Sequence, residues 1–195
     1  MSWLEILGFV TGAASVVLAV RESAWNWIVG IANNVFFFVL FWHTKLYADA
    51  LLQVVYAVIS VYGWWHWIRG GKGNSALPIS RIHSRTAVSL VLVTALSTGL
   101  MTYLLGVFTD SKVPFWDGLT TALSLTAQFM LSRKLLENWL VWMTADVVYV
   151  LLYWYKALYL TGILYAGFLA LCVLGYRGWR KTLHSAALER AVVQG

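Results

Sequence analysis

Long apolar windows separated by short polar breaks run along almost the whole chain. A bilayer core about 30 Å thick needs roughly 20 mostly apolar residues per helix, at about 1.5 Å of rise per residue. Seven such windows are present, at residues 3–20, 25–42, 47–68, 86–107, 115–132, 138–155 and 158–176. The pattern predicts an all-α integral membrane protein with seven transmembrane helices. We expect one domain over residues 1–182 and a short tail at 183–195.

Composition agrees with a membrane protein and excludes several other classes. Hydrophobic residues make up 61% of the chain and charged residues 11%, with a mean hydropathy of +0.72. A water-soluble domain is nearer half apolar and one quarter charged. The single cysteine, Cys172, has no partner in the chain, which excludes a disulfide-stapled secreted module. The first window follows no basic segment and carries no small-residue cleavage signature, so we expect a retained span.

Lysine and arginine residues fall unevenly on the two sides of the predicted bundle. If the helices alternate in direction, one side holds eleven of them: Arg21, Arg69, Lys72, Arg81, Arg85, Arg133, Lys134, Arg177, Arg180, Lys181 and Arg190. The other side holds Lys45, Lys112 and Lys156. Because cytoplasmic loops collect Lys and Arg, this split predicts an N-terminus outside and a cytoplasmic tail. The net charge of +6 is thus a topology signal, and we expect no nucleic-acid partner.

The chain contains an internal repeat. Residues 3–67 align with residues 115–179 without a gap, and three tryptophan pairs match: Trp27 with Trp139, Trp42 with Trp154, and Trp67 with Trp179. Each repeat holds three helices, and a linker helix at 86–107 gives both repeats the same direction. This 3+1+3 arrangement of parallel repeats is typical of SWEET-like transporters, which bind substrate near mid-membrane between the repeats.

Two further features follow from the spacing of glycines. The cytoplasmic loop at 70–85 is rich in Gly, Asn, Ser and Pro, and we expect it to be flexible. Gly63 aligns with Gly175 near the cytoplasmic ends of the third and seventh helices. Each of these two glycines is either a hinge or a point of close packing.

One acidic residue lies deep in an apolar window. Asp146 is about halfway along the sixth window, where a lipid-facing carboxylate would cost roughly 2.5–3.5 kcal/mol. It must therefore face protein or water, and a functional role is expected. The residues that share its helical face, at steps of three and four, are Trp139, Trp142, Tyr149 and Tyr153. The pattern predicts an aromatic wall around one hydrogen-bond acceptor.

Other polar residues occur at corresponding depths in the remaining windows. The repeat aligns Asp146 with Asn34, and Asn33 adds a second amide beside it. An alternative role for such amides is to join helices, at about 0.6 kcal/mol for each bond. Polar residues near the outer ends of helices, Asp49 among them, are alternatively wetted by solvent. The predicted substrate-binding residues are Asn33, Asn34, Asp49, Gln53, Tyr56, Gln128, Trp139, Trp142, Asp146 and Tyr149.

No motif for nucleotide binding, nucleophilic catalysis or zinc binding occurs in the sequence. The four histidines lie at helix ends or in loops without metal-ligand spacing. A seven-helix photoreceptor would need a Schiff-base lysine in residues 158–176, which contain none. An enzyme using Asp146 would need a second catalytic group at the same depth. We therefore expect neither an enzyme nor a bound metal or cofactor.

Four segments resemble the PnuC-type vitamin transporters. They are LYADALLQVVY at 46–56, YGWWHW at 62–67, PFWD at 114–117 and ENWLVWMTAD at 137–146. The last contains the family's Trp-x-x-Trp-x-x-x-Asn/Asp pattern as Trp139, Trp142 and Asp146. The resemblance implies a SWEET-like fold, often homotrimeric, in a bacterial inner membrane. It also implies passive transport of an unphosphorylated vitamin, which a cytosolic kinase then phosphorylates and traps.

The resemblance favours nicotinamide riboside as the cargo, on family frequency. Carriers of that vitamin commonly have Asn at the last motif position, where this chain has Asp146. Relatives that carry thiamine or riboflavin keep those two cargoes open, and a proton-coupled symporter using Asp146 is a further alternative. A pyridinium or thiazolium cation between indole faces gains about 2 kcal/mol or more when desolvated. A carboxylate beside the rings also favours a cationic cargo over a neutral flavin.

Overall fold

The computed structural model describes residues 3–155, 157 and 159–194. This part of the chain contains seven α-helices: α1 (Trp3–Val20), α2 (Trp25–His43), α3 (Tyr47–Arg69), α4 (Ser84–Phe108), α5 (Pro114–Ser132), α6 (Asn138–Tyr155) and α7 (Tyr159–Gln194). A short 3-10 turn, η1 (Lys72–Asn74), follows α3. Each predicted window has become a helix. Lys156, one of the three lysines assigned to the outer side, lies outside the described residues.

The helix ends follow from local backbone chemistry. Pro114 opens α5, since its fixed φ and missing N–H are tolerated in a first helical turn. Glu22 ends α1 at φ 58° and Lys134 ends α5 at φ 49°. In each turn the next residue donates to a carbonyl five positions back, from Ser23 to Leu18 and from Leu135 to Met130. These are Schellman motifs, so aligned positions of the two segments close their helices in the same way.

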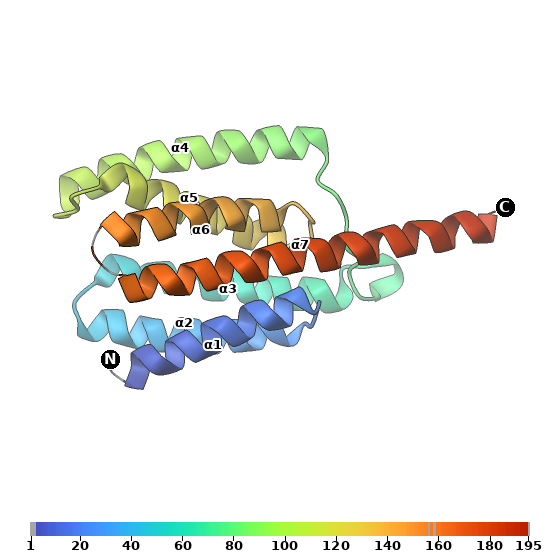
Figure 1. Cartoon of the computed structure of the whole chain (residues 1–195), viewed down its shortest axis with the longest axis horizontal. Helices are drawn as coiled ribbons and strands as arrows, with labels where there is room; N and C mark the ends of the chain where they lie inside the picture. The colour runs from blue at the N-terminus through green and yellow to red at the C-terminus, as the bar shows by residue number, and fades with distance from the viewer. Residues whose placement is uncertain (1–2, 156, 158, 195) are drawn as a thin grey trace.

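The seventh helix is longer than the sequence predicted. Its apolar window ends at residue 176, but α7 continues as one helix to Gln194. The expected tail at 183–195 is therefore helical as far as the description extends. Hydropathy marks only the membrane-crossing part, whereas residues such as Ala186, Ala187 and Leu188 favour helix wherever they stand. Figure 1 shows α7 projecting past the other helices at the end where α1 meets α2.

Among the described residues, four stretches of helix are long and apolar enough to cross a membrane: Trp25–His43, Asp49–Arg69, Ser84–Phe108 and Thr161–Glu189. The Ile6–Val20 part of α1 is apolar but shorter. On α4, large apolar side chains are strongly exposed, among them Val91 at 67% and Leu96 at 74%. A continuous exposed apolar surface of this kind is typical of a face that meets lipid or another protein.

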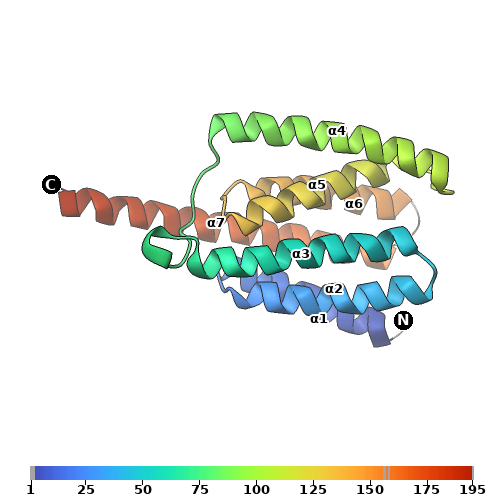
Figure 2. The same cartoon turned by 180° about the vertical axis from the view of Figure 1, so that it is seen from behind.

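The helices form two groups with α4 at the side. α1, α2 and α3 pack in chain order, as do α5, α6 and α7. Contacts of α3 with α5 and of α1 with α7 join the groups, while α4 packs on α5 (Figures 1 and 2). Under the alignment of residues 3–67 with 115–179, these two joining contacts correspond to each other. Each group therefore presents the same pair of helices to the other.

The connection between α3 and α4 is docked against the bundle. Ser80 donates its backbone N–H to the Lys134 carbonyl at 3.1 Å and accepts from the Leu136 N–H at 2.9 Å. The backbone N–H of Ile82 donates to the Glu137 carboxylate at 2.9 Å, and Ile79 is buried. The loop expected to be flexible is thus held by hydrogen bonds to the α5–α6 connection.

Candidate functional site

Asp146 is buried in α6, where 3% of its surface remains exposed. The Cys172 thiol of α7 donates to its Oδ2 atom at 3.4 Å. The aligned positions in the first helix group are Asn34 on α2 and Ser60 on α3, and both are buried. The Ser60 hydroxyl has no hydrogen-bond partner. We call Asn34, Ser60, Asp146 and Cys172 the polar layer, since each lies near the middle of its helix.

A group of aromatic side chains lies along α6 and α7, beginning one helical turn beyond Asp146. Tyr149 and Tyr153 of α6 contact Tyr165 of α7, with ring centroids 4.5 and 5.2 Å from it. Phe168 meets Tyr165 edge-on at 5.7 Å. Tyr149 and Tyr153 of the expected wall thus lie together with Tyr165, and their role in enclosing Asp146 stays a prediction. Sequence reasoning missed Tyr165, although the repeat aligns it with Gln53, which was predicted as a site residue.

Ser124 of α5 brings two predicted site residues together. Tyr56 of α3 and Tyr149 of α6 both approach its hydroxyl. Ser124 itself is buried at 4% exposure. Side chains from α3, α5 and α6 thus converge on one polar point between the two helix groups. Gln53 and Gln128, from α3 and α5, are half-buried.

Asn33 occupies a different place from Asn34. Its side-chain amide donates to the Gly8 carbonyl and to the Thr11 hydroxyl, both in α1. These bonds fasten α1 to α2, which is the helix-joining role considered for such amides. Asn33 therefore lies at the α1–α2 contact, and its role in binding stays a prediction.

The first tryptophan of the family pattern lies in a dense aromatic cluster. Trp139 is 1% exposed and meets Trp179 of α7 edge-on, with centroids 5.4 Å apart. The aligned pair, Trp27 and Trp67, has the same geometry at 5.5 Å. Trp67 also contacts Trp179 at 5.8 Å. We call these four residues, Trp27, Trp67, Trp139 and Trp179, the tryptophan tetrad. Trp142 is half-buried and packs against the buried core cluster to which the tetrad belongs.

Gly63 and Gly175 make the close contacts within the tetrad possible. A Cβ atom on Gly63 would lie 2.6 Å from the Trp27 ring, and one on Gly175 would lie 2.6 Å from the Trp139 ring. No side chain fits at that distance without displacing the indole. Of the two roles considered for these glycines, the contacts support close packing.

Two acidic residues lie near each other at the end of the bundle opposite the tetrad. Asp49 is exposed near the start of α3, close enough to Asp117 for the two charges to interact. Ser111 donates its hydroxyl to the Asp117 carboxylate at 2.6 Å. Of the predicted site residues, Asp49 is thus the one farthest along its helix from the polar layer and the most exposed to solvent.

The polar layer and the aromatic group are suited to binding a small molecule. Asp146 and Cys172 offer an acceptor and a donor, and the ring faces offer stacking surfaces for a planar, electron-poor group. Within the residues that the structure describes, no group of three or more His, Cys, Asp or Glu side chains could hold a metal ion.

Comparison with known proteins gives concordant results along nearly the full length. Residues 2–181 match the family described as "Nicotinamide mononucleotide transporter". The chain is 29% identical over 204 residues to the nicotinamide riboside transporter PnuC of Escherichia coli (strain K12), covering 92% of this chain and 85% of that protein. It is 26% identical over 197 residues to the riboflavin/roseoflavin transporter RibM of Streptomyces davaonensis, covering 99% and 91% of the two chains.

A solved structure shares the fold. The chain superposes on the "Crystal structure of the Vitamin B3 transporter PnuC" with a TM-score of 0.72 and 23% sequence identity. The match covers 94% of this chain and 83% of that one. Together with the family match over residues 2–181, this similarity identifies the protein as a member of the nicotinamide mononucleotide transporter family, to which the PnuC transporters belong.

Proposed function

We propose that the protein is a passive carrier of nicotinamide riboside across a bacterial inner membrane. The observation that carries this proposal is the buried carboxylate of Asp146 in the middle of α6, with aromatic rings along the same helix. A pyridinium cation gains both from a nearby carboxylate and from the faces of aromatic rings. A cytosolic kinase would phosphorylate the released vitamin and so keep transport running inward without ion or ATP coupling at the carrier.

Seven of the ten predicted binding residues have a specific role in this proposal. Asp146 accepts a hydrogen bond from the carboxamide N–H₂ of the cargo, while Trp142 and Tyr149 stack on its ring. Gln53, Gln128 and Asn34 bind ribose hydroxyls or the carboxamide oxygen. The Trp139 ring packs on Trp179, so in this proposal Trp139 does not stack on the cargo. It belongs to the buried cluster against which Trp142 packs.

The proposed architecture is a SWEET-like 3+1+3 bundle with parallel repeats at 3–67 and 115–179. Aligned residues make the same contacts in both groups, as the two Schellman turns and the two edge-on tryptophan pairs illustrate, and this supports the repeat. We further propose that the carrier is a homotrimer with its N-terminus outside and its C-terminus in the cytoplasm. The exposed apolar side chains of α4 would face lipid or a neighbouring subunit.

Riboflavin is the second candidate cargo. The relative RibM is a riboflavin/roseoflavin transporter by name and aligns over 99% of this chain. A flavin is neutral, so Asp146 would bind it through a hydrogen bond from its ring imide without gaining from opposite charge. Thiamine is cationic and would use the same carboxylate as nicotinamide riboside. A proton-coupled mechanism would use Asp146 as the site that binds and releases the proton.

Uptake into proteoliposomes tests these alternatives. Labelled nicotinamide riboside should equilibrate across the membrane without ATP or an ion gradient, and an enclosed kinase with ATP should convert equilibration into accumulation. Asp146→Asn is compared with Asp110→Asn, which changes an exposed carboxylate between α4 and α5. Saturable uptake of riboflavin or thiamine without uptake of nicotinamide riboside would contradict the proposed cargo. Uptake that requires a proton gradient would contradict the passive mechanism.

A further inference from the structure

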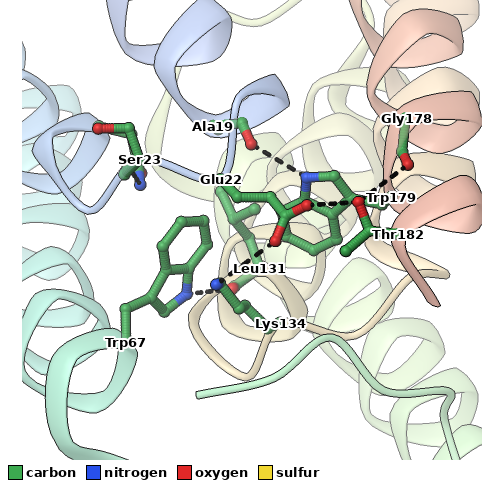
Figure 3. Close-up of polar contacts among 10 residues, drawn as sticks. Ala19, Glu22, Ser23, Trp67, Leu131, Lys134, Gly178, Trp179 and Thr182 are labelled. Atoms are coloured by element: carbon green, nitrogen blue, oxygen red, sulfur yellow. Dashed lines mark hydrogen bonds and ion pairs between the residues drawn. The ribbon is translucent and has the colours of Figure 1, made fainter. Parts of the chain in front are cut away.

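Two tryptophan side chains hold the helix groups together by reciprocal hydrogen bonds. Trp67 of α3 donates its indole N–H to the Leu131 carbonyl of α5 at 2.9 Å. Trp179 of α7 donates to the Ala19 carbonyl of α1 at 3.1 Å. Donors and acceptors occupy aligned positions, so each group gives one bond and receives one (Figure 3). All four residues are buried.

An ion pair lies beside these two bonds. Lys134 is 3.8 Å from the Glu22 carboxylate, and the two residues occupy aligned positions at the ends of α5 and α1. The Lys134 ammonium also lies 4.6 Å from the centroid of the Trp67 ring. Glu22 accepts a hydrogen bond from the Thr182 hydroxyl of α7 at 2.9 Å. Figure 3 shows these contacts gathered between the two helix groups.

Glu22 offsets part of the cost of burying the Lys134 ammonium. The residue is 7% exposed, and burial lowers the pKa of its ammonium while the neighbouring Glu22 carboxylate opposes that shift. A buried cation without its partner is strongly destabilising, whereas a paired one is tolerated. The turns that follow α1 and α5 are therefore joined by an ion pair that links the two helix groups.

We propose that the tryptophan tetrad and the Glu22–Lys134 pair form the gate at this end of the bundle. The proposal rests on the proposed function and adds the residues that close its pathway. The tetrad draws one residue from each of α2, α3, α6 and α7, and all four are at most 2% exposed. They fill the space between the helix groups, so a cargo in the polar layer leaves on this side only when they move apart.

Two buried groups in the tetrad favour a reversible closure over a permanent core. The indole N–H groups of Trp27 and Trp139 are buried and have no hydrogen-bond partner. Unpaired buried donors destabilise the arrangement that contains them. When the groups separate, water reaches these donors and also Glu22 and Lys134. Opening breaks the hydrogen bonds that Trp67 and Trp179 donate, and hydration of the unpaired indole N–H groups offsets part of that free-energy cost.

Charge reversal across the pair tests the gate. Glu22→Lys and Lys134→Glu each place like charges at the contact, and the double variant restores an opposite pair. Spin labels on Arg21→Cys and Arg133→Cys, in a Cys172→Ser background, report the separation of the helix groups without any cargo. Both labelled positions are exposed. We expect each single reversal to raise the separated population about tenfold and the double variant to return it within about threefold.

A matched control reverses a charge that has no such contact. Lys72→Glu changes an exposed residue of η1 at the same end and should leave the distance distribution unchanged. If the reversals prevent folding, Trp67→Phe removes one reciprocal hydrogen bond, keeps an aromatic ring, and should raise the same population. Distances that do not respond to Glu22→Lys, Lys134→Glu or Trp67→Phe overturn the gate. So does a double variant that remains as separated as the singles.

Transport measurements separate this inference from the proposed function. If the protein shows the expected distance changes but does not transport nicotinamide riboside, the proposed cargo is wrong and the proposed gate is supported. In a functional carrier, the single reversals should lower uptake about tenfold while cargo binding in detergent changes less than about threefold. Equal losses of binding and uptake would assign Glu22 and Lys134 to the binding site and overturn the gate.

Discussion

The Asp146 carboxylate accepts one hydrogen bond from the Cys172 thiol at 3.4 Å. An ionised carboxylate can accept about four bonds, so this contact orients Asp146 and leaves most of its capacity for a cargo. Cys172 holds the carboxylate from the α7 side. Cys172 thus fixes the orientation of Asp146, and the proposed recognition of a small cation would use the lone pairs of the carboxylate that remain.

Replacing Asp146 by Asn separates the contribution of charge from that of hydrogen bonding. An amide oxygen still accepts from the carboxamide of nicotinamide riboside, as the Asn of related carriers implies. We expect Asp146→Asn to raise the Kd of thiamine about tenfold and that of nicotinamide riboside about threefold or less. Calorimetric titration of both vitamins measures the difference, and equal weakening of both would contradict it.

Glycine-to-alanine exchanges test the close packing beneath the tetrad. Gly175→Ala would force a methyl group to within 2.6 Å of the Trp139 ring, and overpacking of this kind lowers the free energy of unfolding by about 1–3 kcal/mol. Gly167→Ala in the same helix meets nothing within 4 Å and should raise it by about 0.5–1 kcal/mol. Unfolding in detergent measures both variants. A neutral Gly175→Ala would mean that the glycine serves as a hinge.

The sequence predicted the burial of a residue correctly where a charged side chain stands within an apolar segment. A carboxylate in the middle of an apolar window must be buried, and Asp146 is buried. The tetrad was not predicted, because a tryptophan in an apolar window is equally compatible with a membrane interface and a protein core. The repeat aligns Trp27 with Trp139 and Trp67 with Trp179, but only the fold shows that Trp27 packs on Trp67, Trp139 on Trp179, and Trp67 on Trp179.

At the scale of elements, apolar windows located every helix because the bilayer constrains length and composition together. Two segments outside the windows were misjudged. α7 continues to Gln194, and the α3–α4 connection is docked. Neither could be found from hydropathy, since a polar helix and a hydrogen-bonded loop bury little apolar surface. The connection depends on partners that are distant in sequence, such as Glu137 for the backbone of Ile82, whereas the extension of α7 follows from local helix propensity.

The docked connection can be released by one substitution. Glu137→Ala removes the acceptor of the Ile82 N–H, which lies 2.9 Å from the carboxylate. We expect faster amide hydrogen exchange at Ile82 and its neighbours, because local opening no longer has to break that bond. Glu189→Ala, on the exposed end of α7, is the control and should leave this segment unchanged. If Glu137→Ala leaves exchange in the connection unaltered, other contacts hold the segment.

For the whole molecule, two helix groups joined by corresponding contacts should respond equally to corresponding substitutions. Trp67→Phe and Trp179→Phe each remove one N–H donor that crosses between the groups. Each should lower the free energy of unfolding by about 1 kcal/mol. Trp67 differs from Trp179 in one respect, since Lys134 lies 4.6 Å above its ring. Phenylalanine attracts a cation less strongly than tryptophan, so Trp67→Phe should cost slightly more.

A double-mutant cycle isolates that difference. In a Lys134→Met background the cation is gone, and the two tryptophan substitutions should then cost the same within about 0.5 kcal/mol. Reversible unfolding in detergent supplies the six free energies required. If Trp67→Phe and Trp179→Phe still changed the free energy of unfolding by different amounts without Lys134, the two hydrogen bonds would not contribute equally to stability. The tetrad would then act as an asymmetric core, and closure by matched halves would have to be abandoned.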